Sequence, residues 1–284
     1  MIARRSARGA VMAEPQSLGH LELSRTPPSI PFVVAALVVA LMMTAQGALA
    51  ADDSVLDGFT SHEYRSAAGV TLPYRLYSPP SAGAGERLPL ILYLHGSGGA
   101  GTDNRKQISG GNTRGTHLWL EAGIQTRHPA FVLAPQIPDK TTWHSANDQS
   151  SMHGAALLQL VDELRSELNI DANRIYVVGQ SLGGFGAWDL IARQPARFAA
   201  AIPLCGAGDV RRIVAARDVA VWAFHGARDK TVPVSRSREI VAALRTVNPS
   251  VKYTEYAEVG HDVWTRAFAE RDLPEWLFAQ RRRD

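Results

Sequence analysis

Three side chains that stand far apart in the sequence are of the types that together transfer acyl groups. Ser181 is the centre of a G-x-S-x-G motif, and Asp229 and His261 follow it in that order. A serine hydroxyl is a poor nucleophile until a base accepts its proton, and the base needs a carboxylate to orient it. These residues predict nucleophilic attack by Ser181 on an acyl carbon, with His261 as the base and Asp229 as its orienting acid.

The serine stands where a strand turns sharply into a helix. Residues 174–178 (RIYVV) are typical of a buried strand, and a helical stretch follows Gly179-Gln-Ser-Leu-Gly183. In such a turn the nucleophile adopts a strained conformation, and the chain passes so close to itself that the flanking residues must be small. We therefore expect Ser181 to project from the sheet at the start of a helix, where the helix dipole favours developing negative charge.

The acid and the base each follow a predicted strand. Asp229 lies in the loop after residues 219–224, and His261 lies in the loop after residues 251–256. The carboxyl ends of parallel strands meet at one edge of a sheet, so both residues are expected beside the serine. Asp209 also follows a strand and is the alternative acid.

A glycine-rich loop follows another predicted strand, at 94-LHGSGGAG-101. Such a loop lets backbone N–H groups point at a substrate oxygen. We expect an oxyanion hole formed by the N–H of Leu182, the residue after the nucleophile, and the N–H of Ser97, with Gly98 as the alternative second donor. The loop has no G-x-x-x-x-G-K-[ST] pattern, which argues against a phosphate-binding loop.

Short apolar segments alternate with helical ones along most of the chain, which predicts βαβ units and a parallel sheet covered on both faces. A β-hairpin is expected from residues 61–66 and 71–77. The predicted strands are 90–94, 130–134, 174–178, 199–204, 219–224 and 251–256. The predicted helices are 113–125, 152–168, 182–193, 235–247 and 263–280. The fold class is therefore α/β.

The first fifty residues are typical of a signal peptide rather than of the fold. Residues 32–43 (FVVAALVVALMM) form an uncharged apolar run, shorter than the about 20 residues that span a membrane. Small residues at Ala48 and Ala50 predict cleavage after Ala50, leaving 51–284 as a single catalytic domain. We expect a secreted or periplasmic protein without stable membrane insertion after cleavage; an uncleaved anchor and a start at Met12 are the alternatives.

Composition excludes several other classes of protein. The 284 residues are 45% hydrophobic and 20% charged, and the formal net charge is +3 with both signs interspersed, so no nucleic-acid partner is expected. The single cysteine, Cys205, excludes an intramolecular disulfide and multi-cysteine metal sites. We interpret Cys205 as a small buried residue at a strand end. The histidines show no metal-ligand spacing, and no metal or cofactor is expected.

With these residues identified, the chain resembles the α/β-hydrolase family. Four patterns carry the resemblance: LHGSGGAGTDN (94–104), GQSLGGFGAWDL (179–190), HGARDKTVP (225–233) and GHDVW (260–264). The likeness is to secreted esterases of the feruloyl-esterase and polyhydroxybutyrate-depolymerase-like group, and to the phospholipase/carboxylesterase and predicted-peptidase branch. It implies hydrolysis of a small-molecule or polymeric carboxylic ester through an acyl-enzyme. A serine peptidase of the prolyl-oligopeptidase type shares the same triad and is the alternative.

The spacing of the strands also predicts an open site. Many lipases of this fold carry a lid domain after the sixth strand, whereas here only residues 205–218 separate two strands. Walls are expected from the loops 98–112 and 135–151. Gly98, Gln180 and Trp143 are the predicted substrate contacts, with Trp143 as an aromatic wall; packing of Trp143 onto the body of the protein is the alternative.

Overall fold

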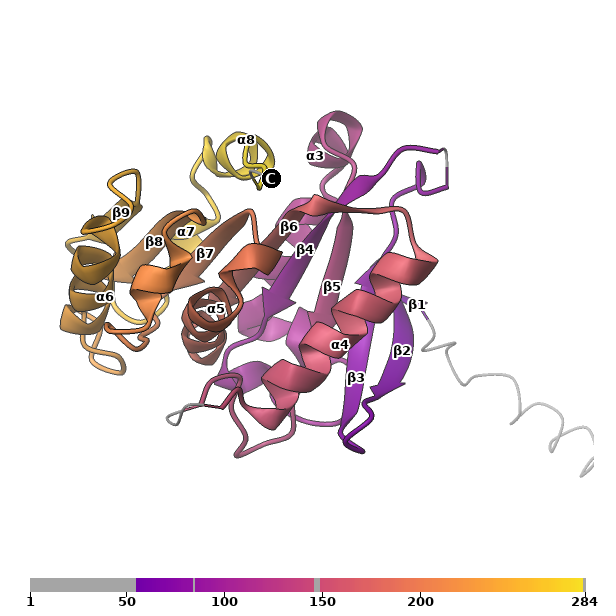
Figure 1. Cartoon of the computed structure of the whole chain (residues 1–284), viewed down its shortest axis with the longest axis horizontal. Coiled ribbons are helices and arrows are strands. Elements are labelled where there is room, and N and C mark those ends of the chain that lie inside the picture. Colours follow the sequence, from indigo (N-terminus) through magenta and orange to yellow (C-terminus); the bar gives the residue numbers. More distant parts are fainter. Residues whose placement is uncertain (1–54, 84, 146–148, 283–284) are drawn as a thin grey trace, which may run out of the picture. The chain divides into compact units, whose positions relative to one another are not determined.

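The central element of the fold is one large twisted sheet. The computed structural model describes residues 55–83, 85–145 and 149–282. The predicted signal peptide, its cleavage after Ala50 and the start at Met12 lie outside the described residues. The described strands form a nine-stranded sheet in the order β1-β2-β3-β5-β4-β6-β7-β8-β9 (Figure 1). Their bounds are β1 Val55–Leu56, β2 Phe59–Arg65, β3 Thr71–Tyr77, β4 Leu88–Leu94, β5 Phe131–Pro135, β6 Ile170–Gln180, β7 Ala200–Leu204, β8 Ala220–Gly226 and β9 Lys252–Tyr256.

The sheet has an antiparallel edge and a parallel body. β1, β2, β3 and β5 pair antiparallel, and the pair β2–β3 is the predicted hairpin. From β5 through β4, β6, β7 and β8 to β9 every pair is parallel, so the carboxyl ends of these strands share one edge. The mostly parallel sheet confirms the predicted fold class.

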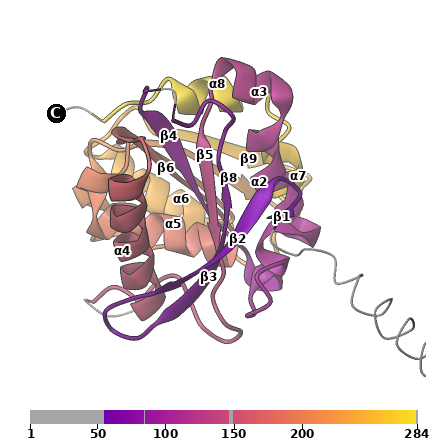
Figure 2. The same ribbon diagram turned by 90° about the vertical axis from the view of Figure 1, so that its right-hand side faces the viewer.

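Helices cover both faces of the sheet, as Figure 2 shows: α4, α5 and α6 lie on one face, and α2, α3, α7 and α8 lie on the other. Their bounds are α2 Thr113–His117, α3 Ala122–Arg127, α4 Met152–Glu167, α5 Leu182–Arg193, α6 Ser235–Arg245, α7 Trp264–Ala267 and α8 Leu273–Phe278. Short 3₁₀ turns lie between them: η1 Ser97–Gly99, η2 Lys106–Ile108, η3 Gly110–Asn112, η4 Leu118–Leu120, η5 Pro195–Arg197 and η6 Ile213–Ala216.

Strand β4 shows how the sheet divides the core into two layers. Its leucines at positions 88, 90, 92 and 94 pack in one hydrophobic cluster, while Ile91 and Tyr93 belong to the second. All seven residues of the strand are buried, because successive side chains point to opposite faces and both faces are covered. This burial fixes the register of the strand that leads into the glycine-rich loop.

Two predicted helices are interrupted in the structure. The segment 113–125 bends at Glu121, whose extended backbone (ψ 130°) separates η4 from α3 and accompanies complete burial of Trp119. The segment 263–280 divides into α7 and α8. Pro274 lies in the first turn of α8. Because proline has no N–H to donate to the preceding helical turn, it is accommodated at the start of a helix but not inside a longer one.

The connection between β7 and β8 contains only the short turn η6, which confirms that no large lid is inserted there. Strand β6 is longer than predicted, because Ile170 pairs with Leu88 beyond a bulge. Among the described residues, no helix combines the length and apolar character needed to cross a membrane.

Candidate active site

The turn from β6 into α5 holds Ser181 in a strained conformation. Its φ of 52° and ψ of −118° lie in a region that residues with a side chain rarely adopt. A Cβ on Gly179 would lie 2.1 Å from Gly183 O, and a Cβ on Gly183 would lie 1.9 Å from Leu94 O. The two flanking glycines are therefore a steric requirement, and the G-x-S-x-G motif has the strand–turn–helix setting of a nucleophile elbow.

Ser181, His261 and Asp229 form one chain of hydrogen bonds. Ser181 Oγ lies 2.8 Å from His261 Nε2, and His261 Nδ1 lies 2.7 Å from Asp229 Oδ2. A carboxylate only accepts, so Nδ1 carries the proton and Nε2 is free to accept the serine hydroxyl. The structure thus brings together the three residues that the sequence predicted, from the ends of β6, β8 and β9.

Asp229 is held as a buried carboxylate by its own loop. Its Oδ1 accepts hydrogen bonds from the N–H of Thr231 at 2.8 Å and of Val232 at 2.9 Å. Burial by itself raises the pKa of Asp229, but the hydrogen bonds from His261, Val232 and Thr231 outweigh it and lower the pKa below its ordinary value. The acid therefore stays ionised while it orients the imidazole.

His225, at the end of β8, is a second histidine that contacts the acid. Its Nε2 lies 3.3 Å from Asp229 Oδ2 and 2.9 Å from Val232 O, and its Nδ1 lies 2.7 Å from Ser237 Oγ. Both neighbours of Nε2 are acceptors, so Nε2 carries the proton. The ring is completely buried. No pattern in the sequence indicated directly that His225 belongs to the site; its position four residues before Asp229 was the available signal.

Asp209, the alternative acid, takes no part in this chain. Its carboxylate accepts from the N–H of Arg211 and Arg212 and lies 40% exposed beside their side chains. Among the described residues, the hydrogen bond of His261 Nδ1 goes to Asp229. The geometry therefore selects Asp229.

One expected oxyanion donor directly follows the serine, and the other lies in the loop after the neighbouring strand β4. Leu182 is the first residue of α5, and Ser97 begins η1 in the loop after β4, which runs beside β6. Within the described part of the chain the N–H groups of Leu182 and Ser97 donate to no partner, whereas the N–H of Gly96 is taken by Asn112 Oδ1. Ser97 and Gly98 are exposed.

A buried histidine fixes this loop. His95 Nδ1 donates to Gly96 O at 2.6 Å, and His95 Nε2 accepts from the N–H of Ile137 at 3.2 Å. Burial lowers the pKa of His95 to about 4, although the bond to Gly96 opposes this shift. The ring is therefore neutral, with one nitrogen donating and the other accepting, and it ties the loop after β4 to the loop after β5.

Gln180, a predicted substrate contact, is occupied in the interior. Its Oε1 accepts from Tyr93 Oη at 2.8 Å and its Nε2 donates to Gly111 O at 3.0 Å, and the residue is only 3% exposed. The prediction of a substrate contact is wrong for this side chain, because both of its polar ends are already satisfied by the protein. Gln180 instead anchors the loop 98–112 to β6.

Trp143, the predicted aromatic wall, is buried as well. It is 1% exposed, its indole N–H donates to His95 O at 3.2 Å, and a Cβ on Gly186 of α5 would lie 2.4 Å from Trp143 Cβ. The ring packs against α5 and His95, so it cannot line an open cleft. Of the predicted contacts, Gly98 keeps an exposed place on the loop.

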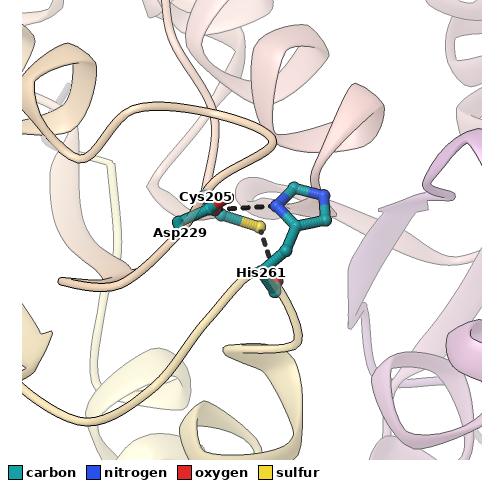
Figure 3. Close-up of side chains that lie close together, drawn as sticks. All are labelled: Cys205, Asp229 and His261. Atoms are coloured by element: carbon teal, nitrogen blue, oxygen red, sulfur yellow. Dashed lines mark hydrogen bonds and ion pairs between the residues drawn. The ribbon is translucent and has the colours of Figure 1, made fainter.

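Cys205 lies beside the acid and the base (Figure 3). Its Sγ, one carboxylate oxygen of Asp229 and one ring nitrogen of His261 lie within 4.8 Å of one another, and the thiol donates weakly to His261 O at 3.5 Å. Burial raises the pKa of the Cys205 thiol well above its usual range. Metal ions bind thiolate rather than thiol, so this set does not favour a metal. The buried position agrees with the interpretation of Cys205 as a packing residue.

A parallel sheet with helices on both faces and a serine on a strained turn defines an α/β-hydrolase. A family model described as phospholipase/carboxylesterase matches residues 82–272. The chain belongs to this family of ester hydrolases. No curated protein sequence gave a match.

Solved structures agree with this assignment. A thermostable esterase is similar at 36% identity and a TM-score of 0.76 over 80% of this chain, which spans 64% of the length of that esterase. A feruloyl esterase module from Clostridium thermocellum has 14% identity and a TM-score of 0.58, covering 79% of this chain and 90% of the module. An acylaminoacyl peptidase from Pyrococcus horikoshii has 14% identity and a TM-score of 0.56, and the match covers 79% of this chain and 42% of the peptidase. The last two show the fold alone.

Proposed function

We propose that this protein is a secreted serine hydrolase that cleaves carboxylic esters through a covalent acyl-enzyme. One observation carries the proposal: the hydrogen-bond chain from Ser181 Oγ through His261 to Asp229, built on a nucleophile elbow. Membership of the phospholipase/carboxylesterase family supports the ester as the bond that is cleaved.

The geometry indicates a role for each group. Ser181 Oγ attacks the acyl carbon while its proton passes to His261 Nε2, and Asp229 stabilises the imidazolium that forms. The N–H groups of Leu182 and Ser97 stabilise the oxyanion. Collapse of this intermediate breaks the ester bond, and the departing alcohol takes the proton from His261 Nε2. Water then attacks the acyl carbon while His261 Nε2 takes its proton. Collapse of the second intermediate returns that proton to Ser181 Oγ and releases the carboxylic acid.

The substrate class that the open site supports is an aryl or polymeric ester. The connection between β7 and β8 is short, so no large lid covers the carboxyl edge of the sheet from that position. A bulky ester can then approach Ser181 with its reacting bond at the surface. A serine peptidase of the prolyl-oligopeptidase type is the competing possibility, and faster turnover of a peptide amide than of the matching ester would favour it.

The test is the variant Ser181→Ala. Removing the nucleophile is expected to lower kcat for p-nitrophenyl acetate by roughly 10³-fold or more and to abolish labelling by a fluorophosphonate probe. Ser166→Ala is the matched control, because Ser166 Oγ only contacts Glu163 O on the exposed side of α4. Full activity in Ser181→Ala would refute the proposal.

Secretion is proposed from the apolar run 32–43 and the small residues at Ala48 and Ala50. Expression of the full chain in a bacterium, followed by N-terminal sequencing of the exported protein, is expected to give a chain that begins at Ala51. Retention of the whole protein in the cytoplasm would contradict it.

A further inference from the structure

A cavity of about 460 Å³ adjoins the triad and has no role in the steps above. This volume is within the range of small-molecule sites. Its walls are one face of α5, the loops after β7 and β8, and part of the loop before α4. The lining residues that matter here are His144, Phe185, Asp189, Arg193, Asp209 and Arg236.

The cavity shares two of its walls with the catalytic groups. Phe185 lies one helical turn after Ser181, and its N–H donates to Ser181 O at 3.1 Å. Thr231 and Val232, which also line the cavity, are the residues whose N–H groups hold Asp229. The cavity therefore borders the segments that carry Ser181 and Asp229.

One side of the cavity is aromatic. The rings of His144 and Phe185 lie 5.0 Å apart at 32° to each other, and both line the cavity. Burial lowers the pKa of His144 against the opposing effect of Asp189, so its ring is neutral near pH 7. A pair of neutral rings is suited to contact the face of another ring.

The deeper side of the cavity carries a sequestered ion pair. Phe185, Asp189 and Arg193 recur every four residues, so α5 presents them on one face. Arg193 Nε donates to Asp189 Oδ1 at 2.8 Å, and the side chains are only 7% and 12% exposed. A carboxylate has about four acceptor positions, so Asp189 can accept a further hydrogen bond from a ligand.

The charges that line the cavity balance. Asp189 and Asp209 oppose Arg193 and Arg236, which favours an uncharged ligand over a phosphate or a quaternary amine. A neutral ring that carries a hydroxyl meets both requirements, because its face can contact the aromatic side and its hydroxyl can donate to the carboxylate.

We infer that this cavity binds an uncharged, hydroxyl-bearing ring of the ester substrate, with Asp189 accepting the hydroxyl and Phe185 contacting the ring. The inference rests on the proposed function. The ring can come from a phenolic acid or from a sugar. Asp189 thereby determines specificity without taking part in bond cleavage.

The test compares matched esters that differ in their hydroxyls. One pair is methyl 4-hydroxycinnamate and methyl cinnamate, the other is 6-O-acetylglucose and cyclohexylmethyl acetate, and ethyl acetate is the reference without a ring. In the wild type the hydroxylated member of one pair is expected to have a kcat/KM at least about tenfold higher. The pair that shows the preference identifies the source of the ring.

In Asp189→Asn this preference is expected to fall to about threefold or less, because a neutral amide is a weaker acceptor than a carboxylate. Asp162→Asn is the matched control. Asp162, on α4, pairs with Arg165 and Arg197 and does not line the cavity, so removing its charge should leave the preference intact. Phe185→Ala is a second variant, expected to raise KM for both ring esters of the preferred pair more than it raises KM for ethyl acetate.

Two results would overturn the inference: a wild type that shows no preference for the hydroxylated ester in either pair, or a preference that survives in Asp189→Asn. In both cases turnover of ethyl acetate by the wild type would leave the proposed function intact. If no ester is hydrolysed, the proposed function fails by itself. Calorimetric titration of the wild type and of Asp189→Asn with 4-hydroxycinnamamide, cinnamamide and glucose then decides the inference. The inference stands if a hydroxylated ring compound binds Asp189→Asn at least about tenfold more weakly than it binds the wild type, and falls otherwise.

Discussion

Asp229 shows how much the environment of one side chain contributes to this site. Four groups converge on its two oxygens: the N–H groups of Thr231 and Val232 on Oδ1, and the rings of His261 and His225 on Oδ2. The first two fix the position of the carboxylate. His225 contacts the same oxygen as His261, at 3.3 Å, and so limits rotation of Oδ2 away from the base.

We therefore predict that His225→Ala lowers kcat for p-nitrophenyl acetate by roughly 10- to 100-fold with little change in KM, because small displacements of a catalytic group slow the reacting step. His225→Gln, which can still donate to Asp229, should recover part of the loss. Ser237→Ala is the control, since it removes the partner of Nδ1 and a bond to Gly206 O but leaves the contact of Nε2 with Asp229. An unchanged kcat, or a loss that appears in KM alone, would contradict a positioning role.

At the scale of elements, the site depends on how closely β4, β6 and α5 approach one another. Gly183, in the first turn of α5, lies directly against the end of β4. Gly184 lies against the end of β7, where an added Cβ would be 2.4 Å from Leu204 O. These contacts are with backbone atoms, which cannot move aside as a flexible side chain does. The elbow, and with it the direction of Ser181 Oγ, therefore requires that Gly183 and Gly184 carry no Cβ.

Gly183→Ala is accordingly predicted to destabilise the fold by several kcal/mol and to abolish fluorophosphonate labelling, because its Cβ would lie 1.9 Å from Leu94 O. Gly123→Ala in α3 is the comparison: its Cβ meets only Arg127 Nη1, at 3.7 Å, and alanine should stabilise that helix by up to about 1 kcal/mol. Thermal unfolding of the two variants measures the contrast, and equal melting temperatures would show that the elbow tolerates a side chain.

For the whole molecule, buried neutral histidines link stability to pH. Burial lowers the pKa of His95 to about 4, and it also lowers the pKa of His153 and of His225. In the unfolded chain a histidine has a pKa of about 6.5. The unfolded state therefore binds protons first as the pH falls, and the stabilisation present above about pH 6.5 is lost progressively toward pH 4.

The free energy of unfolding is expected to fall between pH 7.5 and pH 4.5, with His95 contributing roughly 3 kcal/mol to the whole range of its titration. His95→Gln should be less stable at pH 7.5 and should lose less on acidification. Ser166→Ala, on the exposed side of α4, removes no titratable group; it is the control and should keep the wild-type slope. Urea denaturation followed by tryptophan fluorescence measures both, and an identical pH dependence in His95→Gln would contradict this assignment.

The chemistry and the order of the elements could be predicted from the sequence because they depend on local patterns. The turn around Ser181 needs small flanking residues, and parallel strands place their following loops at one edge. Chain order therefore predicted His261 as the base and Asp229 as the acid with Asp209 as its alternative, and the folded geometry separated the two acids. The interruptions in the two helices were harder to predict from the sequence, although Pro274 indicated one of them.

The tertiary structure decided which side chains face the substrate. Trp143 and Gln180 stand in or beside the loops around the site, yet both are buried, because Gly186, His95, Tyr93 and Gly111 supply their partners from other parts of the chain. The ring pair of the neighbouring cavity likewise joins two segments, His144 before α4 and Phe185 in α5. The sequence by itself determined the reacting groups, since local backbone geometry sets them; burial depends on contacts between segments far apart in the chain, and only the folded molecule determines those.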